Sequence, residues 1–196
     1  MLRSPFNMAV IITALSFSAT SAAAQAFGID KATPLSELDV SKDLGTGSYV
    51  VAAPSPHSEF ETYVVQATDQ TGVCLVRGIG KDHDNDMFGV SVRDKFSSLR
   101  SALEDRYGDY ERVEFLRSGA LWDGQDEWVM SIRQNERAHQ AIWAQEYGSD
   151  LPTALNQIIL NIAATSSDSS WIGLQYTFDN HDECERVLAK QDEEGL

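Results

Sequence analysis

Residues 60–79 read FETYVVQATDQTGVCLVRGI, and this stretch indicates the kind of fold that the chain adopts. Two runs rich in β-branched and aromatic residues, 60–67 and 73–79, are separated by the short polar segment 68–72, which ends in a glycine. Such runs with such a connection are typical of a β-hairpin. The stretch therefore predicts two adjacent antiparallel strands in the middle of the chain.

Other parts of the chain carry the same strand signal. Residues 158–163 and 171–178 are apolar and are joined by the polar segment TSSDSS, which predicts a second hairpin near the C-terminus. Single strands are expected at residues 49–52 and 110–116.

The runs 127–132 and 138–143 are open to two interpretations. As strands they would form a third hairpin across the polar turn RQNER. As one long helix they would place Trp128, Ile132 and Ala138 partly on one side. We favour the hairpin.

The clearest helix signal begins at Ser91. Ser91 and Asp94 have the N-cap and N3 spacing of a capping box with Asp in place of Glu. Gly108 stands where a left-handed residue would end the helix. An apolar stripe is made at three- and four-residue steps by Val92, Phe96, Leu99 and Leu103. With a short charged helix at residues 182–192, the sequence predicts an α+β fold, mainly an antiparallel sheet with one or two packed helices.

A short pattern occurs twice at an offset of 61 residues. Phe27-Gly28-Ile29 precedes Leu35-Ser36, and Phe88-Gly89-Val90 precedes Phe96-Ser97. In each copy a helix-like segment follows the Phe-Gly pair, and a β-hairpin comes later. A fixed offset is typical of a duplicated unit. The pattern favours a tandem αβ duplication, with repeats 27–87 and 88–184, inside one domain of residues 27–196; a chance match is the alternative.

The first 26 residues carry the pattern of a cleaved signal peptide. Arg3 gives a cationic start, residues 8–17 are apolar, and two A-x-A sites follow at 22–24 and 24–26. The apolar run is about half of the roughly 20 residues that a spanning helix needs. No cysteine near the cleavage site could carry a lipid. We therefore expect a soluble protein without a membrane anchor, in the periplasm or secreted to the medium.

The chain has two cysteines, Cys74 and Cys184. An even count in an exported chain favours a disulfide. Two free thiols or a cysteine nucleophile are the alternatives, but the apolar run around Cys74 favours a structural role. The bond would tie the middle of the chain to its C-terminal end.

This order of elements resembles known binding proteins. A helix followed by hairpin strands, twice over, in a small exported chain with a disulfide resembles the β-lactamase-inhibitor-like proteins, and a single copy is similar to the BamE-like outer-membrane assembly lipoproteins. The resemblance covers the element order and the Phe-Gly … Ser-x-Leu fragment, and it implies a protein that binds other proteins and does no chemistry. The lipidated cysteine of the lipoproteins is absent, so the resemblance implies no anchored role.

The net charge of the chain indicates which classes of partner it can bind. The chain has 15 Lys and Arg against 30 Asp and Glu, a net charge of −15. Such a surface repels nucleic-acid phosphates and anionic lipids, so we expect no nucleic-acid binding. It suits a protein partner with a basic patch; simple solubility is the alternative.

Asp82, Asp84 and Asp86 alternate in the way that calcium loops present carboxylates. Met87 stands where the loop needs glycine, and Arg93 stands where it needs a bidentate glutamate. We therefore expect a solvated loop and no metal.

No motif in the chain predicts catalysis or a cofactor. A nucleophile elbow, a P-loop and a dinucleotide-binding fingerprint are all missing from the sequence. No zinc-ligand spacing is formed by the four histidines, which are His57, His83, His139 and His181. We expect no enzyme activity and no cofactor. The alternatives are an exported hydrolase with a site assembled from distant residues, or an envelope protein that binds a metal or small ligand.

Trp122 is the strongest candidate for a binding residue. It lies in a loop between Gly119 and Gly124, and exposed aromatic residues of this kind often anchor protein interfaces. The alternative is that it folds back onto the sheet. We predict an exported, non-catalytic, binding or inhibitor-like protein of the bacterial-type cell envelope. Its partner surface would be on a sheet face or at Trp122, Asp123 and Trp128.

Overall fold

The hairpin predicted at residues 60–79 is confirmed and forms part of a larger sheet. A computed structural model, which describes residues 25–194, pairs β5 (Phe60–Thr68) with β6 (Gly72–Gly80) in antiparallel register. The C-terminal hairpin is confirmed as β9 (Leu155–Ala164) and β10 (Ser170–Phe178). Because β6 also pairs with β10, the two hairpins join into one sheet.

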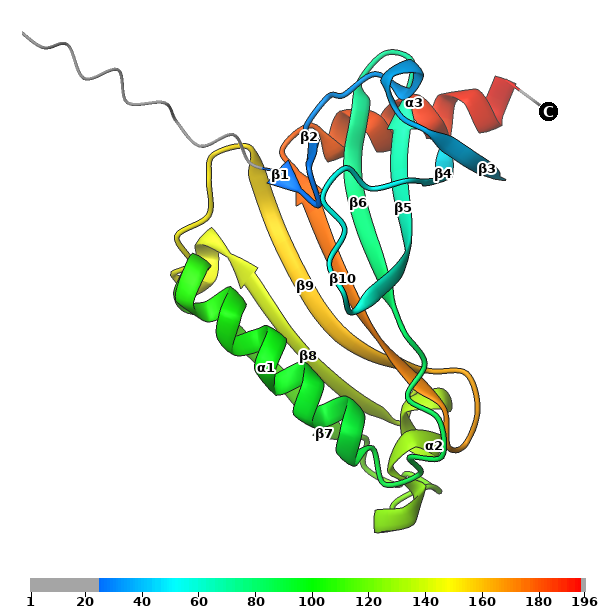
Figure 1. Cartoon of the computed structure of the whole chain (residues 1–196), viewed down its shortest axis with the longest axis vertical. Helices are drawn as coiled ribbons and strands as arrows, with labels where there is room; N and C mark the ends of the chain where they lie inside the picture. The colour runs from blue at the N-terminus through cyan, green and yellow to red at the C-terminus, as the bar shows by residue number, and fades with distance from the viewer. Residues whose placement is uncertain (1–24, 195–196) are drawn as a thin grey trace, which may run out of the picture.

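The whole sheet has eight antiparallel strands in the order β3-β4-β5-β6-β10-β9-β8-β7 (Figure 1). Two four-stranded meanders therefore meet at its middle. The remaining strands are β3 (Val40–Gly45), β4 (Ser48–Val51), β7 (Glu111–Leu116) and β8 (Arg137–Ala144), and a small separate ribbon is made by β1 (Gln25–Ala26) and β2 (Ile29–Asp30). This confirms the α+β, mainly antiparallel fold. The signal peptide predicted for residues 1–26 lies outside the described residues, except for its last two.

The predicted central helix is confirmed as α1 (Val90–Tyr107). Figure 1 shows α1 running along the part of the sheet formed by β8 and β9. The helix ends at Gly108, as predicted, but its φ of 72° and ψ of −147° differ from the left-handed helical conformation that the sequence predicts. This region of φ and ψ is open almost only to glycine. The buried side chains of α1 are Val92, Phe96, Leu103 and Tyr107.

The start of α1 differs from the predicted capping box. The N-cap residue is Gly89, and the acceptor is the carboxylate of Asp86, which lies three residues before it. Asp86 accepts hydrogen bonds from the backbone N–H groups of Val90 (2.7 Å), Ser91 (2.8 Å) and Val92 (3.1 Å). Ser91 is already inside the first turn and cannot act as the N-cap. One carboxylate thus satisfies three of the four N–H groups that a helix leaves free at its start.

The strand predicted at residues 127–132 is wrong. This segment forms the 3-10 turn η2 (Gln125–Glu127) followed by α2 (Trp128–Arg133). A strand would direct only alternate residues toward the core, whereas the short helix buries Trp128, Val129, Ser131 and Ile132 together. The other half of the expected hairpin is confirmed as β8, whose partners are β7 and β9.

The first Phe-Gly pair is not followed by a helix. After Phe27 and Gly28 come β2 and a single 3-10 turn, η1 (Leu35–Glu37). The intervening backbone bonds to the sheet instead, since Ala32 donates to the carbonyl of Val73, whose N–H donates back to Thr33. The tandem duplication itself stays a prediction.

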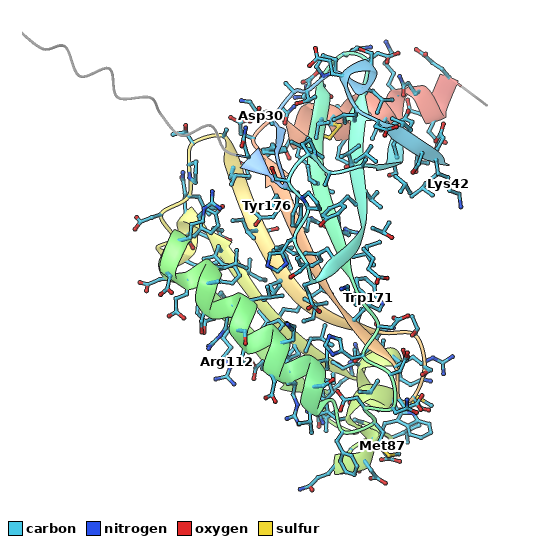
Figure 2. The ribbon with its side chains drawn as sticks, in the orientation of Figure 1. Asp30, Lys42, Met87, Arg112, Trp171 and Tyr176 are labelled. Atoms are coloured by element: carbon cyan, nitrogen blue, oxygen red, sulfur yellow. A yellow bond between two sulfur atoms is a disulfide. The ribbon has the colours of Figure 1, made fainter. Side chains whose placement is uncertain are left out.

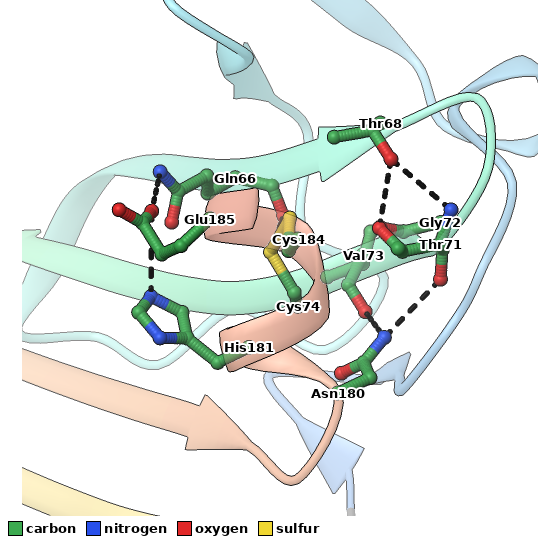
Figure 3. The surroundings of a disulfide bond; sticks show 10 residues. All are labelled: Gln66, Thr68, Thr71, Gly72, Val73, Cys74, Asn180, His181, Cys184 and Glu185. Atoms are coloured by element: carbon green, nitrogen blue, oxygen red, sulfur yellow. Dashed lines mark hydrogen bonds and ion pairs between the residues drawn. A yellow bond between two sulfur atoms is a disulfide. The ribbon is translucent and has the colours of Figure 1, made fainter. Parts of the chain in front are cut away.

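The predicted disulfide is present between Cys74 in β6 and Cys184 in α3 (His181–Glu194), and both residues are fully buried (Figure 3). Polar contacts fix the same helix beside the bond. Gln66 donates to Glu185 (2.8 Å), and Asn180 donates to the carbonyls of two residues of the β5–β6 turn and β6, Thr71 and Val73. α3 is therefore attached to the β5–β6 hairpin at several points.

One face of the sheet packs under helix α1, and on the opposite face, here called the open face, α3 covers part of β5 and β6. In β9 the buried residues Ile158, Leu160 and Ile162 alternate with half-exposed residues, and in β10 buried Ile172 and Leu174 alternate with half-exposed Trp171 and Gln175. α1 packs on the buried side, so Trp171 and its neighbours lie on the open face. Within residues 25–194, no helix is long and apolar enough to cross a membrane.

Candidate functional site

Three chain connections meet at one end of the sheet. They are the β6–α1 connection (81–89), the β7–β8 connection (117–136, which contains α2) and the β9–β10 turn (165–169). Figure 1 shows them together beyond the ends of β6, β8 and β10. Backbone hydrogen bonds link them, from Asp86 to the carbonyl of Asp168 (2.9 Å) and from Val129 to the carbonyl of Met87 (3.2 Å). These hydrogen bonds join the three segments, which together are called the loop end.

Exposed apolar side chains are concentrated at the loop end. Leu121 is 82% exposed, and Met87, Phe88 and Val90 are between 42% and 52% exposed. Figure 2 places Met87 at the opposite end of the molecule from Lys42, which lies on β3. Together with Trp122, these four residues are called the loop-end patch. Large apolar side chains gathered at one surface region are typical of interaction sites.

The loop that carries Leu121 and Trp122 is held to the body of the protein by Glu136. One oxygen of Glu136 accepts hydrogen bonds from the backbone N–H groups of Leu121 and Trp122, both at 2.9 Å. Trp122 is half-buried and Asp123 is exposed. Glu136 therefore holds the backbone of the loop at Leu121 and Trp122.

Trp128 lies beneath this surface and is only 8% exposed. The guanidinium carbons of Arg93 and Arg137 lie 5.0 and 5.8 Å from its ring centroid. A side chain at Gly89 would lie 2.1 Å from the indole Cε3, so the chain needs glycine there. Trp128 thus supports the loop end from inside, while Trp122 and Asp123 lie at its surface. A binding role for these three residues stays a prediction.

The acidic loop 82–86 is used for internal contacts. Asp84 accepts from Ser169 in the β9–β10 turn (2.7 Å), and Asp86 caps α1. The carboxylates therefore face different partners instead of converging on one point. Among residues 25–194, no three His, Cys, Asp or Glu side chains are placed to hold a metal ion.

The four histidines lie apart, and each makes its own contacts. His57 is exposed, His139 pairs with Glu114 (3.5 Å), and His181 lies 3.8 Å from Glu185 on the same helix. His83 bridges two other side chains, with Nδ1 at 2.9 Å from Ser91 Oγ and Nε2 at 3.2 Å from Glu59 Oε1.

The Ser91–His83–Glu59 chain of contacts has the residue types of a hydrolytic triad. Catalysis would also need free N–H donors to stabilise an oxyanion. The nearest such donors, the first N–H groups of α1, already donate to Asp86. Ser91 Oγ also donates to that carboxylate (3.0 Å), which directs its proton away from His83. These contacts join α1 and the β6–α1 connection to the residue that precedes β5.

His139 has the most distinctive electrostatic setting of the four. Burial lowers its pKa below the ordinary value, and this outweighs the opposite effect of Glu114; Arg93, Arg112 and Arg137 lower the pKa further. Burial alone would raise the pKa of Glu114, but the hydrogen bond from Arg112 and the nearby positive charges lower it overall. At neutral pH the pair is therefore a neutral imidazole beside a carboxylate.

Sequence reasoning found the loop of Trp122 but missed Met87, Phe88 and Leu121 as surface residues. Met87 and Phe88 are separated from Leu121 by more than thirty positions, and only the sheet topology brings the two segments to one end. No family model, no curated protein and no solved structure matches the chain.

Proposed function

We propose that this chain is an exported, non-catalytic protein that binds another protein through the loop-end patch. The observation that carries the proposal is the concentration of exposed apolar side chains at the loop end, led by Leu121 at 82% exposure. Interfaces of this kind have an apolar centre and a polar rim. The hold of Glu136 on the backbone at Leu121 and Trp122 also favours binding, since less ordering entropy is then lost.

The rim of the patch suggests the chemistry of the partner. In the connections that carry the patch, four exposed aspartates outnumber three exposed basic residues: Asp82, Asp84, Asp123 and Asp126 against Lys81, Arg117 and Arg133. The whole chain also has a net charge of −15. A partner with an apolar surface flanked by Lys and Arg would complement both features, and the opposite charges would speed association.

Export is part of the proposal, and the fold suggests where the mature chain begins. Ala26 is fully buried and pairs with Ile29, and the neighbouring Phe27 packs edge-on against Phe60 and Tyr63. Cleavage after Ala26 would remove β1, whereas cleavage after Ala24 keeps it. We therefore place the mature N-terminus at Gln25, in the periplasm or the medium. Intact-mass measurement of the exported protein distinguishes the two sites.

A hydrolase is the second candidate, because Ser91, His83 and Glu59 are hydrogen-bonded in series. A non-catalytic role is favoured because Asp86 accepts hydrogen bonds from the first N–H groups of α1 and from the Ser91 hydroxyl.

The experiment is capture from envelope extract with three forms of the mature protein. Wild type is compared with Phe88→Ser/Leu121→Asp, which disrupts the patch, and with Leu44→Asp, a control at a 47%-exposed position on β3. We expect one partner to be retained by wild type and by the control, lost with the patch variant, and weakened by high salt. Capture of the same proteins by all three forms would contradict the proposal.

A further inference from the structure

A second surface feature lies along α1 and meets the loop-end patch at Val90. A pocket of about 500 Å³ lies between α1 and the strands β7 and β8. Arg93, Phe96 and Arg100 follow one stripe of the helix at three- and four-residue steps and face it. The opposite wall comes from Arg112 and Glu114 of β7 and His139 of β8, which register places on the same face of the sheet. Figure 2 shows Arg112 beside α1.

The charge balance of the pocket is the reverse of that of the whole chain. Three arginines line it, with Arg137 next to it, against the two carboxylates of Asp94 and Glu114. The cluster holds four of the 15 Lys and Arg residues in a chain with 30 Asp and Glu. The local charge of this pocket is therefore opposite to that of the rest of the chain.

Three of the four arginines are held by neutral groups. Arg93 donates to the carbonyl of Gly89 (2.9 Å), Arg100 donates to Tyr110 Oη (2.6 Å), and Arg137 donates to Ser131 Oγ (2.8 Å). None of the three has a carboxylate within 4.0 Å in the described part of the chain. Their positive charges are positioned but not neutralised.

The remaining charges do not cancel this excess. His139 is neutral at neutral pH, because its pKa is lowered by burial and by the arginines around it. Glu114 is ionised and pairs with Arg112. Burial and the charge of Arg93 lower the pKa of Arg137, as is expected where two guanidinium groups lie close together without an anion.

We propose that this pocket binds a small molecule through an oxyanion group, a carboxylate or a phosphate. Arginine presents planar, forked donors that match both groups. Val90 forms an exposed apolar part of the wall that would cover the rest of a small ligand. The site adjoins the loop-end patch at Val90, but it does not depend on the proposed protein partner.

The test uses two probes, sodium phosphate and sodium acetate, titrated at constant ionic strength while the ring resonances of His139 are followed by NMR. We expect a saturable shift with at least one probe and a rise in the pKa of His139 as bound anion offsets the arginine charges. Whichever probe binds more tightly identifies the ligand class. No saturable shift up to about 10 mM of either probe, where a millimolar site would be largely occupied, would overturn the proposal.

Two substitutions that remove charges of opposite sign should change the affinity for the anion in opposite directions. Arg112→Gln should weaken anion binding about 3- to 10-fold, because it removes a positive charge from the pocket. Glu114→Gln should tighten binding by a similar factor, because it removes a negative charge. Both side chains are partly exposed, at 66% and 26%, so both variants should fold. The matched control is Arg186→Gln on α3, where the arginine is 72% exposed and pairs with Glu183. Equal weakening by Arg112→Gln and Arg186→Gln would contradict a specific pocket.

Discussion

Two residues of the β6–α1 connection, Asp86 and Gly89, have structural roles that their sequence context does not indicate. Asp86 looks like one member of an acidic loop, yet its carboxylate accepts three backbone N–H groups at the start of α1. Gly89 looks like a helix-adjacent glycine, yet its positive φ of 65° and the nearby Trp128 ring exclude a side chain. Both residues hold the connection that presents Met87 and Phe88.

Asp86→Ala should lower the free energy of unfolding by about 2 kcal/mol, because the N–H groups of the first turn lose their acceptor. Chemical denaturation measures the change. The control is Asp82→Ala, which removes an exposed carboxylate of the same loop and should change stability by less than about 0.5 kcal/mol. Equal effects of the two substitutions would mean that capping is not what Asp86 contributes.

His139 should make the protein less stable in mild acid. Its pKa is lowered in the folded state, so the unfolded chain takes up a proton first as the pH falls below about 6.5. The free energy of unfolding should then fall by up to about 1.4 kcal/mol per pH unit until the folded-state pKa is reached. Below about 4.5 the lowered pKa of Glu114 acts in the same direction.

Denaturation at a series of pH values tests this account of His139. His139→Gln should flatten the profile between about pH 6.5 and 5, because that proton is no longer taken up on unfolding. His57→Gln, at an exposed position, should leave the slope as it is in wild type. An unchanged slope in His139→Gln would contradict the pKa assignment.

At the scale of elements, the sequence allowed most of the sheet to be predicted, because each predicted strand is an apolar, β-branched run between polar turns. The error at residues 127–132 has a physical reason. Trp128, Val129 and Ile132 give a short apolar run of the kind that fits a strand or a helix, and only burial of the whole turn against β8 and β9 decides the outcome. The absence of a helix after Gly28 likewise depends on bonds to Val73 that sequence does not show.

The disulfide was predictable from the even cysteine count, the expected export and the apolar run around Cys74, and its contribution can be measured. Cys74→Ala/Cys184→Ala should lower the free energy of unfolding by about 3–5 kcal/mol, since the bond closes a separation of 110 residues. Reductant should destabilise wild type by a similar amount and leave the double variant unaffected. Equal stability of wild type and the double variant under oxidising conditions would show that the polar contacts of α3 suffice.

At the scale of the whole molecule, the candidate site is where sequence reasoning was least complete. The loop around Trp122 was identifiable because an aromatic residue stands between glycines. In the sequence, Met87 and Phe88 belong to an acidic loop and to the start of a repeat. Their exposure depends on how two distant connections meet beyond the sheet, which the sequence does not show. The arginine pocket under α1 was missed for the same reason, since α1, β7 and β8 each supply only part of it.

Hydrogen–deuterium exchange on the complex with the captured partner tests the central claim most directly. If the loop-end patch is the interface, binding should slow exchange in segments 81–90 and 117–128, while β3 and β4 should exchange as they do in the free protein. Protection confined to the β3–β4 hairpin, or no protection at the loop end, would contradict the account.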